Sequence, residues 1–266
     1  MTAHSFLLPA HWADRPVRIA LIGAGGSGSQ IADQLASLET TLRKLGHCGF
    51  NVSVFDGDVV SDSSVGRQRF TQSDVGAHKS MLIVHRVNAF YGLAWRAIPQ
   101  HYRIDKTQRY LNFDLVITAV DLAGFRAELG RTYRNEPTGA LWLDLGNGED
   151  SGQVVLGHLG RAVGAVLRLP NVFDLYPELA SMEALDREAP SCSTEEAIRR
   201  QSWPINRLAA LTATELLWSL LRHGRIETHG AFFRLAPMTI QPLVIDPQAW
   251  SFLGYDATEK EPQRAA

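Results

Sequence analysis

The chain has 266 residues, of which 45% are hydrophobic and 20% charged, a composition typical of a globular protein with a substantial core. Its 26 basic and 28 acidic residues give a net charge of -2, which does not favour nucleic acid as a partner. Apolar runs such as Ile19–Ile22 are far shorter than the ~20 residues of a membrane-spanning helix. Residues 1–15 also lack the pattern of a signal peptide. We therefore expect a cytoplasmic protein that does not enter the membrane.

Strand-like and helix-like patterns alternate over the first two-thirds of the chain. Apolar runs predict strands at Val17–Gly23, Val52–Phe55, Arg96–Tyr102, Asp114–Val120 and Ala140–Gly146. Apolar residues at helical spacing predict one helix after the glycine-rich turn that starts at Gly23, a second over Lys79–Phe90, and a third ending near Arg134. This alternation predicts an α/β fold with a doubly wound, Rossmann-like and mostly parallel sheet.

The last third of the chain has a different character. Gly152–His158 predicts an antiparallel strand, Pro204–Leu221 a helix with Pro204 in its first turn, and Gly230–Ile245 one or two closing strands. We find no internal repeat and no second core in the sequence. The prediction is one domain over residues 1–266, with a crossover loop at about 171–200 and a disordered tail at about 257–266.

A glycine-rich turn is the first functional motif. Gly23, Gly25 and Gly28 lie in the segment GAGGSG, directly after a predicted strand and before a predicted helix. Glycine lets the backbone approach a phosphate, and a helix N-terminus offers free N–H groups to it. The motif predicts a nucleotide but does not choose between NAD and ATP, and a tight turn without a ligand is the alternative.

The segment after the second predicted strand favours a triphosphate. Asp56 ends that strand, where an acidic residue commonly binds ribose hydroxyls, but it follows Gly25 by 31 residues instead of the ~20 of a dinucleotide site. Arg67, Gln68 and Lys79 come next. Taken singly, the cations Arg67 and Lys79 are typical of a solvated surface. Together with the glycine turn they suit a triphosphate, whose negative charge they would neutralise.

Three motifs in fixed order carry a resemblance to a known family. GAGGSG, DGDVV…RQRF…DVGAHK and DLVITAVD, between Arg18 and Arg126, resemble the ThiF/MoeB family, which has the fold of ubiquitin-activating enzymes. The segment PSCSTEEAIRRQSWPIN looks most like the ThiF-related branch of the PRTRC (ParB-related, ThiF-related cassette) systems. The resemblance implies ATP and Mg²⁺ as ligands, and adenylation of the C-terminal carboxylate of a small ubiquitin-like or sulfur-carrier protein ending in glycine. It also implies a homodimer.

The resemblance assigns roles to individual residues. Gly26 would lie under the phosphates, Asp56 would hold the ribose, and Arg67 and Lys79 would neutralise phosphate charge. Asp121 would bind Mg²⁺, although the sequence leaves open that it is a helix N-cap instead. The expected nucleotide-binding residues are Gly23, Gly25, Gly26, Gly28, Asp56, Ser64, Arg67, Gln68, Lys79 and Asp121.

Cys192 is the candidate for a second chemical step. Ser193–Glu196 fits a capping box, so a helix is expected to start directly after the cysteine and to lower the pKa of its thiol, an effect that Glu195 and Glu196 oppose. Members of the family often carry a cysteine here, and in several of them it accepts the activated protein as a thioester or a persulfide-linked adduct. We therefore predict Cys192 as catalytic together with Arg67 and Lys79, with an inert loop cysteine as the alternative.

The chain departs from the family pattern at two positions in the expected site. Ser64 stands where Asn is usual, three residues before the phosphate-binding Arg, and Leu122 stands where Asn often follows the metal-binding Asp. These changes are the reason for a second hypothesis beside adenylation, a nonadenylating partner that binds a ubiquitin-like protein. A third, an NAD-dependent oxidoreductase, leaves Arg67 and Lys79 unexplained. Adenylation of a non-protein carboxylate is also open. Because the paired CxxC motifs of many members are absent, no structural zinc is expected.

Overall fold

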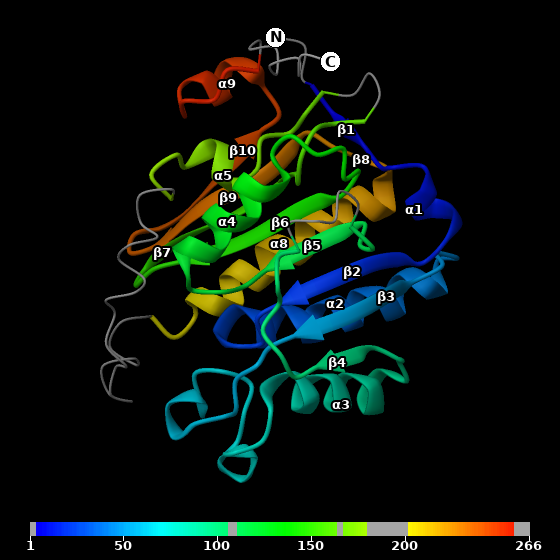
Figure 1. The fold of residues 1–266 in the computed structure, drawn as a ribbon, viewed down its shortest axis with the longest axis vertical. Coiled ribbons are helices and arrows are strands. Elements are labelled where there is room, and N and C mark those ends of the chain that lie inside the picture. Colours follow the sequence, from blue (N-terminus) through cyan, green and yellow to red (C-terminus); the bar gives the residue numbers. More distant parts are fainter. Residues whose placement is uncertain (1–3, 106–110, 164–166, 180–201, 258–266) are drawn as a thin grey trace.

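The computed structural model describes residues 4–105, 111–163, 167–179 and 202–257. An eight-stranded sheet forms its centre, with the strand order β10-β9-β7-β6-β5-β2-β3-β4 (Figure 1). The parallel part consists of β2 (Val17–Ile22), β3 (Phe50–Phe55), β4 (Arg96–Ile98), β5 (Leu115–Thr118) and β6 (Leu141–Asn147). Three antiparallel strands extend it, namely β7 (Ser151–His158), β9 (Thr228–Leu235) and β10 (Met238–Val244). The predicted fold, a mostly parallel sheet with antiparallel C-terminal strands, is confirmed.

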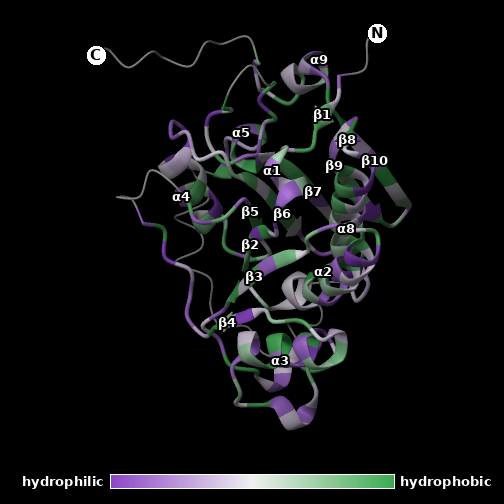
Figure 2. Ribbon diagram, turned by 90° about the vertical axis from the view of Figure 1, so that its right-hand side faces the viewer, coloured by the Kyte–Doolittle hydropathy of each residue, from purple (hydrophilic) through white to green (hydrophobic). Residues whose placement is uncertain are grey.

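Helices cover both faces of the sheet (Figures 1 and 2). On one face, α2 (Gly26–Lys44) packs along α8 (Ile205–His223), and α3 (Lys79–Tyr91) lies beside α2 near the β4 edge. On the other face lie α4 (Ala123–Tyr133) and the short α5 (Val172–Leu175). The remaining short elements are α1 (His11–Asp14), α9 (Pro247–Ser251), the 3₁₀ turns η1 (Asp62–Ser64) and η2 (Gln72–Asp74), and the pair β1 (Phe6–Leu7) with β8 (Arg225–Ile226).

The core explains the sequence pattern of the central strands. Every residue of β5 is buried, as are all but Arg18 in β2 and all but Asn147 in β6. Strands covered on both faces need apolar residues at every position, so they appear as continuous hydrophobic runs rather than alternating ones. Among the described residues, none of the helices combines the length and the apolar character that a membrane span requires.

Some boundaries differ from the prediction. The strand expected over 96–102 ends at Ile98, and Pro204 precedes α8 as its N-cap instead of joining its first turn. The two-residue strands β1 and β8 were not predicted, because so short a segment has no measurable periodicity. Of the expected crossover loop, residues 171–179 are described and include α5, whereas 180–200 and the expected tail from 258 lie outside the described residues.

The order of the strands creates a crevice at one edge of the sheet. From β2 the chain moves outward through β3 to β4, and then returns to place β5 on the other side of β2, followed by β6. The segments after β2 and β5 therefore leave in opposite directions from neighbouring strand ends. In open α/β sheets, ligands bind at such a switch point, outside the carboxyl ends of the strands.

Candidate functional site

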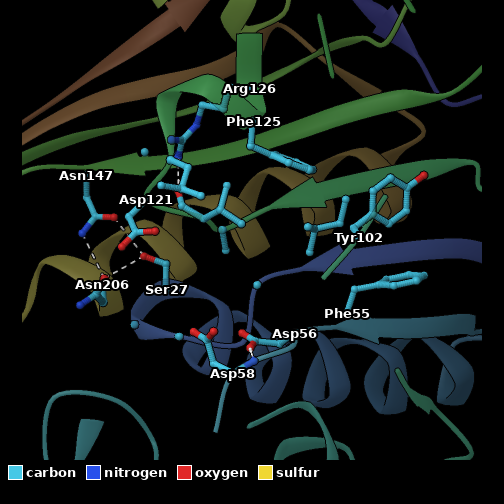
Figure 3. Close-up of a pocket in the computed structure, with 18 of the residues that line it drawn as sticks. Ser27, Phe55, Asp56, Asp58, Tyr102, Asp121, Phe125, Arg126, Asn147 and Asn206 are labelled. Carbon is cyan, nitrogen blue, oxygen red and sulfur yellow. Dashed lines mark hydrogen bonds between the residues drawn. The ribbon is translucent and has the colours of Figure 1, made fainter. Parts of the chain in front are cut away.

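A cavity of about 610 Å³ lies at this switch point (Figure 3). Its walls come from the glycine turn after β2, the end of β3, the loop before α3, the start of α4, the end of β6 and the first turn of α8. Eight of the ten predicted nucleotide-binding residues line it, namely Gly23, Gly25, Gly26, Asp56, Arg67, Gln68, Lys79 and Asp121. Gly28 and Ser64 do not line it.

The glycine turn brings the backbone to the floor of the cavity. Gly23 has a φ of 94°, and a Cβ there would lie 2.7 Å from the carbonyl oxygen of Ala119. The N-cap of α2, which begins at Gly26, is Gly25, and it has no side chain to cap the helix, so the first N–H groups can bind an anion. Gly28 has a packing reason instead, because a Cβ there would collide with the carbonyl oxygen of Gly23.

Asp56 ties the end of β3 to the glycine turn. Its Oδ2 accepts a hydrogen bond from the Ala24 N–H at 2.6 Å, and its Oδ1 accepts one from the Asp58 N–H at 2.8 Å. Asp58 in turn forms an ion pair with Lys79, with 3.0 Å between Oδ2 and Nζ. Asp58 lines the cavity and was missed by the sequence analysis, although the repeat of Asp in the segment DGD was a signal for it.

Gln68 presents a polar atom without a partner. The side chain is 8% exposed and lies near Gly25, and its Oε1 has no hydrogen-bond partner in the part of the chain that is described. A buried acceptor that lines a cavity fits a ligand that supplies a donor, such as a hydroxyl or amino group. Ser64, by contrast, turns inward, and its Oγ accepts a hydrogen bond from the Ser61 N–H at 3.3 Å within η1.

Polar side chains gather at one end of the cavity. Figure 3 shows Asp121, Ser27, Asn147 and Asn206 converging there from four different elements or their ends. The N-cap of α4 is Leu122, and no hydrogen bond or ion pair of Asp121 is found among the described residues. The Asp121 carboxylate therefore does not cap the helix and is available to a ligand.

Aromatic rings line the opposite end. Phe55 and Tyr102 meet edge to face with 5.0 Å between ring centroids, and Tyr102 lies 6.4 Å from Phe125 in the same arrangement. Burial raises the pKa of Tyr102 to about 12, so its phenol is neutral at physiological pH. These rings suit a flat apolar group such as a nucleobase. The sequence analysis missed them because only the fold brings residues 55, 102 and 125 together.

One wall of the cavity contains a buried ion pair. Nε of Arg126 lies 2.7 Å from Oδ1 of Asp144, which is fully buried. Nη2 of Arg126 also donates to the carbonyl oxygens of Val120 at 2.7 Å and Leu145 at 3.1 Å. The guanidinium thereby links the backbone at the carboxyl ends of β5 and β6. Its contact on the β5 side is with Val120, the residue that precedes Asp121.

Neither cysteine is found at the cavity: Cys48 lies elsewhere, and Cys192 is outside the described residues. Cys192, the predicted thioester residue, falls in the segment 180–201, which is outside the described residues. Cys48 does not line the cavity. No cluster of three or more His, Cys, Asp or Glu side chains that could hold a metal by themselves occurs in the described ranges.

A family model and several solved structures match this chain, and the solved structures share its fold. The ThiF family model matches residues 15–249. The solved structure of E. coli MccB with ATP is 14% identical and aligns over 86% of this chain and 64% of that one, with a TM-score of 0.58. PaaA, in its selenomethionine form, is 16% identical over 86% of this chain and 64% of its own, also with a TM-score of 0.58.

A further solved structure is the microcin C7 biosynthetic enzyme MccB in complex with N-formylated MccA, 13% identical with a TM-score of 0.55. It covers 86% of this chain and 64% of its own length. The chain thus spans less than two-thirds of the length of these structures, and the likeness shows a shared fold. No curated protein sequence matches the chain.

Proposed function

Because the chain belongs to the ThiF family, we propose that it binds ATP with Mg²⁺ in the cavity and adenylates a C-terminal carboxylate. The proposed substrate is a small ubiquitin-like or sulfur-carrier protein ending in glycine, and the proposed branch of the family is the ThiF-related one of the PRTRC systems. MccB, which shares the fold, has been solved with ATP and with MccA. These ligands belong to MccB and support the class of reaction proposed for this chain.

One observation carries the proposal. Arg67, Lys79 and Asp121 come from separate segments of the chain, and all three line the same cavity as the glycine turn. Two cations and a carboxylate beside a helix N-terminus suit a magnesium triphosphate. The aromatic end would hold the adenine base, and Asp56, which Figure 3 shows between the two ends, would meet the ribose. Gln68, near Gly25, would bind the nucleotide beside the glycine turn.

The residues also fit a magnesium ion. Mg²⁺ in nucleotide sites is held by one or two carboxylates together with phosphate oxygens and water, so a dedicated cage of protein ligands is not needed. Asp121 provides such a carboxylate at the cavity surface. When bound, the ion would add positive charge to the phosphates and favour departure of pyrophosphate.

The chemistry needs positioning more than proton transfer. The substrate carboxylate is already ionised at neutral pH, so no general base is required. Its oxygen attacks the α-phosphorus, the bond from that phosphorus to the bridging oxygen breaks, and pyrophosphate leaves. Arg67 and Lys79 would stabilise the charge that moves onto the leaving group. Lys79, which is paired with Asp58, would exchange that contact for the phosphates.

A second step at Cys192 belongs to the same proposal. The thiolate would attack the carbonyl carbon of the acyl adenylate, form a thioester and release AMP. A homodimer and a cytoplasmic location remain predictions from the sequence.

Ligand-induced stabilisation tests the nucleotide. A ligand that binds only the folded state at 100 times its Kd adds ~2.7 kcal/mol of stability. We expect thermal unfolding to shift upward with ATP and Mg²⁺, and not with NAD. Lys79→Ala should lose most of the shift, whereas Lys44→Ala, an exposed lysine at the end of α2, should keep it.

The other outcomes separate the competing functions. Stabilisation by NAD alone would replace the proposal with an oxidoreductase. Stabilisation by neither nucleotide would favour the nonadenylating partner, in keeping with the position of Ser64 outside the cavity. An equal loss in Lys79→Ala and Lys44→Ala would contradict the assignment of Lys79 to the phosphates.

A further inference from the structure

Asn206 reaches the glycine turn from a distant part of the chain. It is the second residue of α8, 2% exposed, and it lines the cavity. Its Oδ1 accepts hydrogen bonds from Ser27 Oγ at 2.9 Å and from Asn147 Nδ2 at 3.0 Å (Figure 3). Two donors on one oxygen fix the orientation of the carboxamide, so its Nδ2 has a defined direction.

The carboxamide lies directly against Gly26. A Cβ at Gly26 would come within 2.7 Å of Asn206 Oδ1 and 2.9 Å of Nδ2. Any other residue at position 26 would therefore push the Asn206 side chain away. Glycine at position 26 therefore has two effects. It lets a phosphate approach the backbone, and it leaves room for the Asn206 carboxamide beside the N-terminus of α2.

The amide nitrogen of Asn206 is left without an acceptor. No hydrogen bond from Nδ2 is found among the described residues, although the side chain is almost completely buried. Nδ2 is not one of the enclosed side-chain atoms that lack a partner, and Asn206 lines the cavity, so this N–H donor is open to the cavity and to a ligand there. A ligand acceptor beside the first turn of α2 would satisfy it.

The position of Asn206 indicates which acceptor. Figure 3 shows it at the polar end of the cavity, opposite Tyr102 and Phe55. In the proposed function, on which this inference rests, the base takes the aromatic end and the phosphates extend toward Gly26. We infer that Asn206 binds the terminal phosphates of ATP, with Ser27 and Asn147 acting as positioning residues for its carboxamide.

The test compares ATP with AMP, which lacks the terminal phosphates. Titration calorimetry would measure the Kd of each nucleotide, with Mg²⁺ present, for the wild type and for Asn206→Ala and Asn206→Asp. Loss of a hydrogen bond to a charged group should weaken ATP about 10- to 100-fold in Asn206→Ala. Asn206→Asp should weaken it further, since it places a negative charge beside the phosphates. The Kd of AMP should stay the same in both.

Asn51→Asp is the matched control, because it makes the same chemical change on an exposed residue at the opposite end of β3. Ser27→Ala provides a second variant should the changes at 206 prevent folding, and a smaller loss specific to ATP is expected from it. Equal weakening of ATP and AMP, or unchanged binding of ATP, would overturn the inference. If the wild type binds no ATP, the proposed function itself fails.

Discussion

One oxygen of the buried Asp144 carboxylate, Oδ1, is paired by charge and hydrogen bonds inside the sheet, whereas Oδ2 has no hydrogen-bond partner among the described residues. Arg126 lies against one of its oxygens, and the Thr118 hydroxyl donates to the same atom. Trp142 Nε1 donates to that hydroxyl at 2.7 Å, so the chain of contacts crosses neighbouring strands. Since Arg126 also holds the strand ends next to Asp121, the stability of the sheet and the shape of the cavity depend on the same side chain.

Removing Arg126 should therefore be costly. Arg126→Met leaves the charge of Asp144 buried without a cation, and we expect the free energy of unfolding to fall by about 3–5 kcal/mol in urea titrations. The double variant Arg126→Met/Asp144→Asn should recover part of that loss, because no charge remains to be compensated. Arg96→Met, at an exposed arginine on β4, is the control. A loss no larger than that of the control would show that the pair contributes little.

At the scale of a helix, α2 shows how closely the glycine turn and the helix are packed. Replacing glycine by alanine inside a helix normally stabilises a protein by roughly 0.5–1 kcal/mol. Gly28→Ala should have the opposite effect, because its Cβ would meet the backbone oxygen of Gly23, and we expect a loss of about 1–3 kcal/mol in the free energy of unfolding.

The control for this change is Gly148→Ala. A Cβ at Gly148 would lie 3.9 Å from the carbonyl oxygen of Ser151, and Gly148 has no positive φ, so the added methyl group fits there. A stabilised Gly28→Ala protein would mean that α2 can move away from the turn at little cost.

The elements with strong periodicity were predictable, and those held by tertiary contacts were not. The buried strands and the helices α2, α3 and α8 follow from apolar spacing alone. β4 is shorter than its apolar pattern because the chain leaves the sheet after Ile98 and places Tyr102 on Phe55 instead. The strands β1 and β8 exist through pairing with each other, which no local pattern encodes.

At the scale of the whole molecule, the predictable parts of the site are those that short sequence motifs encode. The glycine turn, Asp56, Arg67 and Lys79 lie within one stretch of sequence. The place of Asn206 in the site could not be predicted from the sequence, because Asn206 belongs to α8 and contacts the glycine turn only when α8 packs along α2. The aromatic end is likewise a product of topology, so the shape of the site needs the fold.

Two buried histidines make the stability of the whole molecule depend on pH. Burial lowers the pKa of His229 and of His158 to about 4, so both are neutral in the folded protein near pH 7. His229 connects three elements, since Nδ1 donates to Leu156 O at 2.8 Å and Nε2 accepts from Trp250 Nε1 at 2.9 Å. Protonation would remove that acceptor and place a charge in the core.

The sign of the pH dependence follows from linkage. An unfolded histidine has a pKa of ~6.5, so between that value and about 4 the unfolded chain binds protons that the folded protein does not. Acid therefore lowers the free energy of unfolding across this window. His229→Gln, which does not titrate, should reduce the slope by up to ~1.4 kcal/mol per pH unit in urea titrations from pH 7 to 4.5. The exposed His85→Gln is the control. If the free energy of unfolding fell with pH equally steeply in the wild type and in His229→Gln, His229 would take up its proton without unfolding of the chain. Its hydrogen bond with Trp250 would then not be what holds α9 in place.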